Sequence, residues 1–363
     1  MPVEFIGYVG GRNHSEIIPP SGPVIDPDHI ATAAKIHENG GFDRVLVAFH
    51  SNSPESQLIA HHVGHVTHRL GLMIAHRPGF TAPTLAARQF ATLDQLTRGR
   101  VAVHIITGGS DVELQADGDH LTKAERYART EEYLDIVRKE WSSDQPFDHT
   151  GKFYGVRGAG SLVRPYKEGG IPVYFGGSSE EAIAVAGKHA DVYALWGETY
   201  DQVRETVSRV RDAGVRHGRH PRFSLSLRPV IAETEEAAWA KADAILEKAR
   251  ELQERTGFVR SADVPNEGSR RLLAAARQGA RLDKRLWTGI AELTGAKGNS
   301  TSLVGTPGQV ADALLDYYRL GISTFLIRGF DPIPDAYDYG RDLIPRVREL
   351  IAAEDARSSE RVA

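Results

Sequence analysis

One unit repeats along this chain and constrains its fold more than any other feature: a short apolar segment followed by a helical pattern. Eight segments have the character of strands, and the second of them looks buried. They are Val3–Val9, Arg44–Phe49, Leu70–Ala75, Val101–Ile106, a segment that starts at Val173, Asp191–Trp196, Phe223–Ala232 and Thr324–Arg328. Strands that alternate with helices predict a parallel sheet, and a full set of such units predicts an α/β fold of the TIM (β/α)8 barrel type. A doubly wound sheet has less support, because no Gly-x-Gly-x-x-Gly follows the first segment.

The same pattern predicts how the chain divides. We expect a single barrel domain over residues 1–353 and a flexible tail over residues 354–363. Residues 259–299 separate the seventh and eighth predicted strands, and we expect them to form an insertion with helical and loop segments. A small hairpin is expected at residues 147–163, and the polar segment that leads to His120 is expected to be a loop.

The composition excludes several classes of protein. Hydrophobic residues make up 41% of the chain and charged residues 25%, as in globular domains. A net charge of −4 argues against a nucleic-acid-binding surface, and the absence of cysteine excludes thiolate nucleophiles and cysteine-ligated zinc. The sequence shows no set of metal ligands at a recognisable spacing. Because there is neither a signal-peptide pattern nor an apolar run of membrane-spanning length, we expect a cytoplasmic protein.

The segment Val173-Tyr-Phe-Gly-Gly-Ser-Ser179 indicates an anion site. Two glycines make a sharp turn after a strand, and Ser178 and Ser179 stand where a helix begins. Free backbone N–H groups and the helix dipole favour phosphate at such a place. The alternative is that the serines only cap the helix and the glycines only form the turn. The repeated strand–helix units favour the phosphate interpretation.

In a TIM barrel, functional side chains follow the carboxyl ends of the strands. The candidates in those positions are His14, His50, Ser53, His76, His104, Thr107, Trp196, Arg228 and Arg328. His76 and His104 are each either a satisfied core residue or a ligand contact, and their positions favour ligand contact. The sequence has no Gly-x-Ser-x-Gly elbow, no Walker loop and no acid pair suited to sugar hydrolysis.

Arginines are the most distinctive group near the strand ends. They are Arg12, Arg77, Arg228 and Arg328. Their planar forks bind oxyanions such as sulfonate, phosphate or carboxylate. The alternative is a structural ion pair, for which the candidate partners are Glu16, Glu198 and Asp331. A barrel that has an anion site but neither a metal site nor an acid pair is expected to depend on a cofactor.

Arg77–Arg100, which reads RPGFTAPTLAARQFATLDQLTRGR, resembles the bacterial-luciferase-like flavin monooxygenases. Within them it looks closest to the two-component, reduced-FMN-dependent alkanesulfonate monooxygenases. The resemblance extends over nearly the whole chain. It includes His-Ile-Ile-Thr-Gly at 104–108, Glu-Arg-Tyr at 125–127, Tyr-Phe-Gly-Gly-Ser-Ser at 174–179, Trp-Gly-Glu at 196–198 and Leu-Trp-Thr-Gly at 286–289.

The resemblance implies that the barrel binds FMN. The residues at the flavin positions are His76, His104, Thr107, Tyr127, Gly177, Ser178 and Ser179. The last three would hold the phosphate with help from Tyr127, and the first three would line the ring and the ribityl chain. The insertion would correspond to the family's mobile loop, which closes over the reduced flavin.

The resemblance also implies a reaction and its partners. A separate NAD(P)H-dependent flavin reductase would supply reduced FMN (FMNH2), and O2 would be the co-substrate. The enzyme would cleave the carbon–sulfur bond of an organosulfonate and release sulfite and an aldehyde. Family members of this kind suggest a homodimer or a homotetramer.

The substrate half of the site departs from the family pattern. Ser53 stands where the family has a cysteine, Ser226-Leu227-Arg228 replaces its Arg-x-Leu-His signature, and Phe330 replaces a tyrosine. We therefore expect a larger, hydroxylated organosulfonate, with sulfoquinovose as the example. Arg228 or Arg328 would hold the sulfonate. The polar residues near the strand ends, which would bind hydroxyl groups, are Asn13, His14, His50 and Asn52, with Trp196 beside them.

Three other functions stay open. An oxidoreductase that uses the deazaflavin F420 would transfer hydride on the same barrel without oxygen. A flavin-binding or storage protein without catalysis would explain the changed substrate residues, although the gain of arginines argues against it. A barrel enzyme for a phosphorylated metabolite is the least specific possibility.

Overall fold

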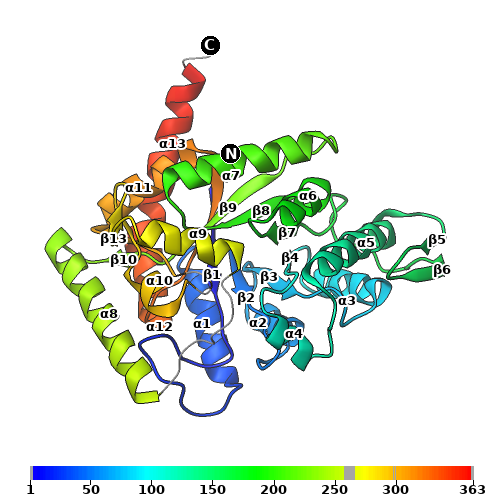
Figure 1. Ribbon diagram of the computed structural model, residues 1–363, viewed down its shortest axis with the longest axis horizontal. Helices are drawn as coiled ribbons and strands as arrows, with labels where there is room; N and C mark the ends of the chain where they lie inside the picture. Colours follow the sequence, from blue (N-terminus) through cyan, green and yellow to red (C-terminus); the bar gives the residue numbers. More distant parts are fainter. Residues whose placement is uncertain (1–2, 257–265, 297, 299, 361–363) are drawn as a thin grey trace. The chain divides into compact units, whose positions relative to one another are not determined.

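The computed structural model describes residues 3–256, 266–296, 298 and 300–360. It confirms the predicted TIM barrel: the barrel strands close in the order β1-β14-β9-β8-β7-β4-β3-β2 (Figure 1). They are β1 (Glu4–Tyr8), β2 (Arg44–Val47), β3 (Gly71–His76), β4 (Val101–Ile105), β7 (Val173–Gly176), β8 (Val192–Trp196), β9 (Arg222–Leu227) and β14 (Ile322–Ile327). Each one overlaps a segment that the sequence predicts as a strand.

Strand register decides which side chains meet at the carboxyl edge. His76 at the end of β3 pairs with Ile105 of β4, and His104 pairs with Tyr174 of β7. Between two other barrel strands, Leu227 of β9 pairs with Ile327 of β14. Arg228 and Arg328 therefore follow the last paired residues of two neighbouring parallel strands.

Helices connect the barrel strands as expected. They are α1 (Pro27–Asn39), α2 (Ser56–Val66), α3 (Pro83–Leu96), α5 (Lys123–Ser142), α6 (Glu180–His189), α7 (Tyr200–Val215), α8 (Glu235–Thr256), α11 (Pro307–Arg319), α12 (Pro332–Asp338), a π-helical turn at Tyr339–Leu343 and α13 (Ile344–Glu360). Their starts follow sequence chemistry. Asp26 caps α1, and Thr122 with Glu125 forms a capping box on α5. The predicted hairpin is also present, as β5 (Phe147–Thr150) and β6 (Gly155–Ala159).

Three predictions of secondary structure were wrong. The seventh strand does not run through Ala232, because the chain leaves the barrel after Leu227 and Pro229 has no N–H to donate to a ladder. The segment before His120 is not all loop: it contains α4 (Asp111–Ala116), which Ser110 caps. The last helix does not end at Ala353, since α13 continues to Glu360 and takes in part of the predicted tail.

The insertion after α8 contains helices and a small sheet. Its elements are α9 (Glu267–Ala276), β11 (Arg281–Leu282), β12 (Leu286–Trp287) and α10 (Gly289–Thr294). β12 pairs with β13 (Ser302–Gly305), and β13 pairs with β10 (Val230–Ile231). The predicted mobile loop falls partly on residues 257–265, 297 and 299, which lie outside the described residues.

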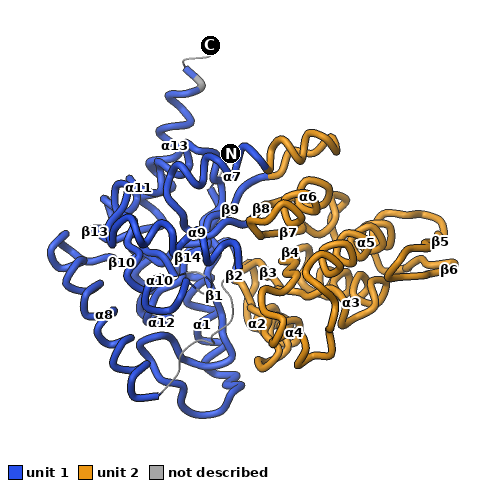
Figure 2. Tube along the Cα trace, viewed as in Figure 1, with its two compact units in different colours: residues 1–45, 194–209, 222–363 blue, residues 46–193, 210–221 orange. Residues whose placement is uncertain are grey.

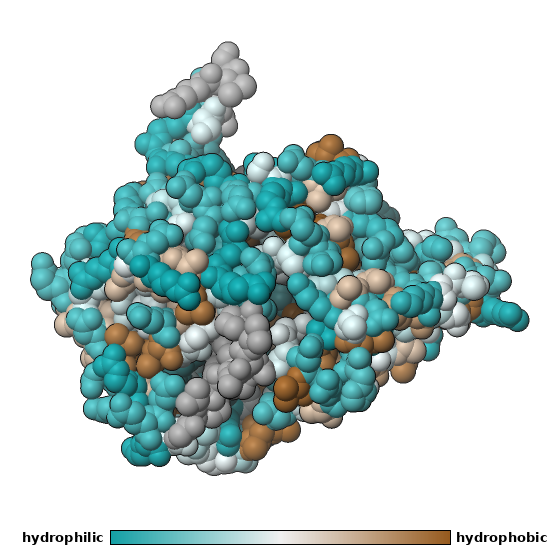
Figure 3. All heavy atoms as spheres, viewed as in Figure 1, coloured by the Kyte–Doolittle hydropathy of each residue, from teal (hydrophilic) through white to brown (hydrophobic). Residues whose placement is uncertain are grey.

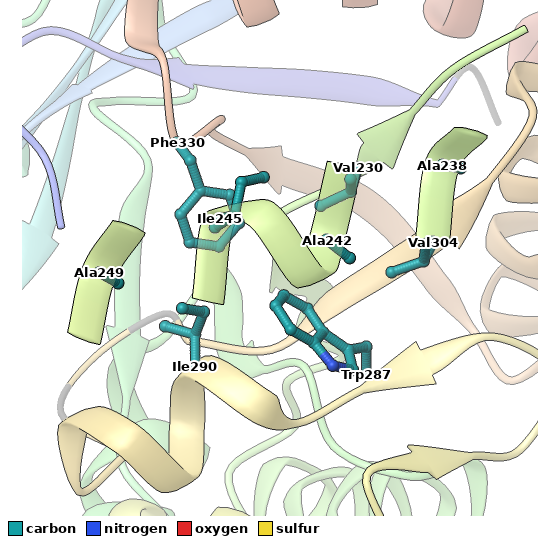
Figure 4. Packing of buried hydrophobic residues seen from close by; sticks show 9 residues of the cluster. All are labelled: Val230, Ala238, Ala242, Ile245, Ala249, Trp287, Ile290, Val304 and Phe330. Atoms are coloured by element: carbon teal, nitrogen blue, oxygen red, sulfur yellow. The ribbon is translucent and has the colours of Figure 1, made fainter. Parts of the chain in front are cut away.

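A hydrophobic cluster joins this small sheet to α8. Figure 4 shows side chains from α8, α10 and the strands of the small sheet converging on one another. Phe330 is part of the cluster and only 1% of its surface is exposed. Its ring therefore contributes to the core, and it is not an open aromatic surface at the strand ends.

The chain forms two compact units (Figure 2). The first comprises residues 1–45, 194–209 and 222–363, and the second comprises residues 46–193 and 210–221. Hydrophilic residues dominate the face in Figure 3, and hydrophobic residues occur there in small groups. Within the part of the chain that is described, no helix combines the length and the apolar composition needed to span a membrane.

Candidate functional site

In the second unit, His76 and His104 stand at the ends of β3 and β4. Nε2 of His76 lies 2.7 Å from the hydroxyl oxygen of Tyr133, and the edge of its ring packs on Phe90. Burial lowers the pKa of His76 and of His104 to about 4, so both rings are neutral at pH 7. They can exchange hydrogen bonds with a polar ligand but carry no charge to attract one.

Two polar atoms near these strand ends are buried without a partner of good geometry. They are Nδ1 of His104 and Oγ1 of Thr107, and within the described ranges neither has a hydrogen bond of good geometry, although the Thr107 hydroxyl lies close to that of Tyr127. An orphaned polar atom costs free energy unless a ligand or water pairs with it. Two of the residues that the family resemblance assigns to a flavin thus have a buried polar atom available to a ligand, which fits a polar group at this edge.

The turn from β7 into α6 has the geometry of an anion cradle. Gly177 has φ +131°, and a Cβ there would lie 2.8 Å from Cβ of Ala182 and 3.2 Å from the hydroxyl oxygen of Tyr127. Burial raises the pKa of Tyr127, against hydrogen bonds with Ser179 and Thr107 that lower it. Glycine is required here by both the backbone conformation and the close approach. The cradle fits a phosphate, with Ser178 half-buried beside it.

Ser179 also caps α6, since its hydroxyl oxygen accepts a hydrogen bond from the N–H of Ala182 at 3.4 Å. The alternative raised by the sequence, a structural cap, is therefore present. The cap uses the N–H of Ala182, and the carboxylate of Glu181 forms hydrogen bonds with its own N–H and with Ser179. A phosphate at the start of α6 would replace these contacts.

The loop after β2 brings His50 and Ser53 together. The backbone N–H of His50 donates to Oγ of Ser53 at 3.0 Å, and both residues are exposed. Arg77, by contrast, is buried and donates to Glu113 of α4 at 2.8 Å. Although burial opposes it, hydrogen bonds from His50 and Arg77 lower the pKa of Glu113 to about 2. Arg77 therefore anchors α4 and is not a free anion-binding group.

In the first unit, Arg228 and Arg328 share one carboxylate. Nη2 of Arg228 donates to Oε2 of Glu16 at 2.8 Å, and Nη2 of Arg328 lies 3.6 Å from the same oxygen. The Arg228 side chain is fully buried, and its guanidinium carbon lies 3.6 Å from the ring centroid of Phe330. Burial lowers its pKa, although Glu16 opposes the shift. Nε and Nη1 of Arg228 have no hydrogen-bond partner among the described residues.

A small pocket opens beside Arg328. Its lining includes Tyr8, His14, His37, Arg328 and Tyr339. The guanidinium of Arg328 lies 4.8 Å from the ring centroid of Tyr8 and keeps 24% of its side chain exposed. Two arginines balanced by one carboxylate leave one positive charge unpaired within this group, so the pocket favours an anion.

Other strand-end residues of the first unit make structural contacts. Arg12 is a surface residue that donates to the carbonyl oxygen of Gly22 at 3.4 Å. Trp196 packs against α9, and both carboxylate oxygens of Glu198 accept hydrogen bonds from Arg271. No group of three or more potential metal-ligating side chains occurs in the residues described.

Three contributing residues were missed at the level of sequence. Tyr133 contacts His76, Glu113 pairs with Arg77, and Arg271 holds Glu198. Only Tyr133 had a usable signal: it continues the helical spacing of Arg126, Arg129 and Thr130 on the buried face of α5. Polar residues at the core-facing positions of a helix indicate a buried polar network.

Comparison with known proteins identifies a family and a shared fold. The model of the family described as luciferase-like monooxygenase matches residues 3–324. A riboflavin lyase, solved with a modified FMN and riboflavin, shares 21% identity and a TM-score of 0.77 over 96% of this chain and 92% of its own. An EDTA monooxygenase from Chelativorans sp. BNC1 shares 18% identity and a TM-score of 0.76 over 96% of this chain and 94% of its own.

An F420-dependent secondary alcohol dehydrogenase, in complex with an F420–acetone adduct, is also similar. It shares 18% identity and a TM-score of 0.68 over 96% of this chain and 99% of its own. Likeness at this level of identity supports the fold and leaves the reaction to the site itself. Because the family match spans most of the chain, this protein belongs to the luciferase-like monooxygenase family.

Proposed function

We propose that the protein is the oxygenase component of a two-component system that desulfonates an organosulfonate with FMNH2 and O2. The observation that carries the substrate class is the shared carboxylate: Arg228 and Arg328 both lie against Glu16, which leaves one positive charge beside the pocket. A sulfonate is a monoanion with three acceptor oxygens, and it suits such a group.

FMN would be held by residues of the second unit. Gly177, Ser178 and Ser179 would contact its phosphate, with Tyr127 beside them, and His104 and Thr107 offer their unpaired polar atoms to the rest of the nucleotide. His76, fixed by Tyr133, would complete the lining. When bound in its reduced form, the flavin supplies the electrons that activate O2. A separate NAD(P)H-dependent reductase would deliver FMNH2.

The overall reaction balances without a metal ion or an external acid. The sulfonate carbon is oxidised to an aldehyde while the carbon–sulfur bond breaks and sulfite leaves. One atom of O2 ends in the aldehyde and the other in water, and FMNH2 is oxidised to FMN. The polar strand-end groups in this proposal, with His14, His50 and Ser53 among them and Trp196 beside them, would bind the hydroxyl groups of a polar substrate such as sulfoquinovose.

A sulfite-release screen tests this function. Purified protein is combined with a flavin reductase, NADH, FMN and O2, and sulfite is measured for a panel that includes sulfoquinovose and short alkanesulfonates. We expect oxygen-dependent sulfite release that is fastest with the hydroxylated sulfonates. No sulfite from any sulfonate, under conditions in which a known oxygenase of this type is active, would refute the proposal.

A second candidate is an F420-dependent oxidoreductase. The observation that favours it is the shared fold of the F420-dependent alcohol dehydrogenase. Titration of the protein with FMNH2 and with reduced F420 separates the two, because only the cofactor that the protein uses should bind at micromolar concentration. A flavin-binding protein without catalysis predicts FMN binding with no oxygen-dependent turnover. The proposed assembly, a homodimer or homotetramer, is tested by sedimentation.

A further inference from the structure

Helix α9 lies directly against the ring of Trp196, at the end of β8. A Cβ added to Gly268, in the first turn of the helix, would lie 2.8 Å from Cζ3 and 2.9 Å from Cε3 of Trp196. These distances are shorter than real Cβ contacts, so only glycine allows the ring to take this place. Trp196 also packs on a buried cluster formed by Leu272 of α9 with Ala291 and Ala296.

Arg271 fixes the same helix to the residue two positions after Trp196. Its Nε donates to Oε1 of Glu198 at 2.8 Å, and its Nη2 donates to Oε2 at 2.9 Å. Nη1 reaches Glu205 of α7 at 3.1 Å, and the side-chain amide of Gln202 donates to the carbonyl oxygen of Arg271 at 3.2 Å. A bidentate fork of this kind fixes both distance and orientation.

The ion pair between Arg271 and Glu198 is buried, and both carboxylate oxygens accept a hydrogen bond from Arg271. The side chains of Arg271 and Glu198 keep 14% and 4% of their surface exposed. The backbone carbonyl of Glu198 accepts a hydrogen bond from the hydroxyl of Tyr317 at 2.7 Å, which holds the carboxylate from the other end. With both oxygens bound to one guanidinium, Glu198 is not available to move protons. Through Arg271, the carboxylate instead holds α9 in place.

We propose that Arg271 and Gly268 are positioning residues for Trp196. Arg271 clamps α9 onto Glu198, and Gly268 leaves the space in which the indole ring settles against the helix. Neither residue needs to touch a ligand for this role. The functional consequence rests on the proposed function, in which Trp196 contacts the substrate, whereas the positioning itself is independent of any reaction.

The test uses Trp196 as its own reporter. Its emission is isolated by subtracting the spectrum of the matching Trp196→Phe protein. Arg271→Met is compared with Arg270→Met, because Arg270 is the adjacent residue of α9 and pairs with Glu267 on the exposed side of the helix. We expect Arg271→Met to shift the Trp196 emission to longer wavelength and to raise acrylamide quenching about twofold. Arg270→Met should match the parent protein in both.

Two further variants keep the result interpretable. Arg271→Lys retains the positive charge but not the bidentate fork. Its folding stability should therefore be closer to that of the parent protein than its Trp196 emission and quenching are. Gly268→Ala changes no charge, yet it should displace the ring, because its Cβ would overlap the indole of Trp196. Unchanged emission and quenching in both Arg271→Met and Gly268→Ala, with both proteins folded by circular dichroism, would overturn the proposal. If Arg271→Met does not fold, the Trp196 emission and quenching of Gly268→Ala and Arg271→Lys decide whether the proposal holds.

Kinetics add a readout that a merely structural pair would not give. If the screen finds a sulfonate substrate, Arg271→Met and Gly268→Ala should raise KM by about tenfold and change kcat by no more than about threefold. An effect confined to the amount of folded protein contradicts positioning. If no substrate is found, the proposed function fails while the emission experiment still decides the role of Arg271 and Gly268.

Discussion

Oε2 of Glu16 lies 2.8 Å from Nη2 of Arg228, an arginine whose side chain has no exposed surface. A guanidinium buried to this degree cannot rely on water, so its charge depends on Glu16, on the carbonyl oxygen of Gly329 and on the ring of Phe330. Arg328 contacts the same carboxylate at 3.6 Å but keeps part of its side chain exposed at the pocket. Arg328 can therefore contact a ligand in the pocket, whereas Arg228 is enclosed by protein atoms.

This difference predicts separate effects of two matched substitutions. Arg228→Met should lower the free energy of unfolding by about 3–5 kcal/mol, because it leaves Glu16 without its closest partner. It should also abolish sulfite release while FMN affinity is kept. Arg328→Met should cost little stability but weaken binding of the anionic substrate by about tenfold or more. Urea unfolding and calorimetric titration with the best sulfonate of the screen measure the two effects.

The control for both changes is Arg12→Met, which removes an exposed arginine that donates to a backbone carbonyl. It should alter neither stability nor anion affinity by a measurable amount. Equal stability of Arg228→Met and the parent protein would contradict the structural role of the buried pair. Anion binding that survives Arg328→Met unchanged would place the substrate elsewhere.

A second prediction concerns the start of α6. Ser179→Ala should remove a helix cap, at a cost of about 1 kcal/mol in stability, and it should also weaken FMN binding by about tenfold. Thr306 caps α11 in the same way, so Thr306→Ala should cost similar stability without changing FMN affinity. Fluorescence quenching of FMN gives the dissociation constants. Equal effects of the two substitutions on FMN binding would mean that Ser179 is only a cap.

The barrel was predictable because its signal is repeated and local. Each barrel strand has its own apolar residues, and several helices, α1 and α5 among them, have their own caps, so an error at one unit does not affect the prediction of the next. The strand that was misjudged, Phe223–Ala232, shows the limit: apolar residues occur on both sides of Arg228, but the chain changes sheets after Leu227. Which sheet a residue joins depends on distant partners, such as the pairing of Val230 with Val304.

The candidate site was predictable in residue type but not in pairing. Strand-end position identifies Arg77, Arg228 and Arg328, yet nothing local separates the buried from the accessible ones. Arg77 is paired because α4, which the sequence did not reveal, brings Glu113 to it. Likewise Arg271 reaches Glu198 across 73 positions of sequence. Ion pairs between distant segments are decided by the assembled fold, and their partners have no sequence period of their own.

A third prediction follows from the two neutral histidines. The folded-state pKa of His76 and of His104 is about 4, below the ordinary value of 6.5, so the unfolded chain takes up these protons first. The stability associated with both rings is fully present above pH 6.5 and is lost as the pH falls towards 4. Each ring should contribute at most about 1.4 kcal/mol per pH unit in that window.

Urea unfolding between pH 7.5 and 4.5 measures this dependence. His104→Gln keeps a polar side chain that does not titrate, so its stability should vary less steeply with pH than that of the parent protein. His65→Gln, a change of an exposed residue on α2, is the control. Identical slopes for His104→Gln and the parent protein would show that His104 is protonated equally in the folded and unfolded states.

The last prediction concerns Glu113, the partner of Arg77. Its folded-state pKa is about 2, below the ordinary value of 4.5, so its contribution to stability is present above pH 4.5 and is lost as the pH falls towards 2. Glu113→Gln removes the charge that Arg77 needs and should cost about 2 kcal/mol or more at pH 7, because Arg77 is buried. The difference in unfolding free energy between the two proteins should therefore shrink as the pH is lowered below 4.5. A difference that stays constant down to pH 3 would mean that the carboxylate of Glu113 is not what holds Arg77 and α4 in place.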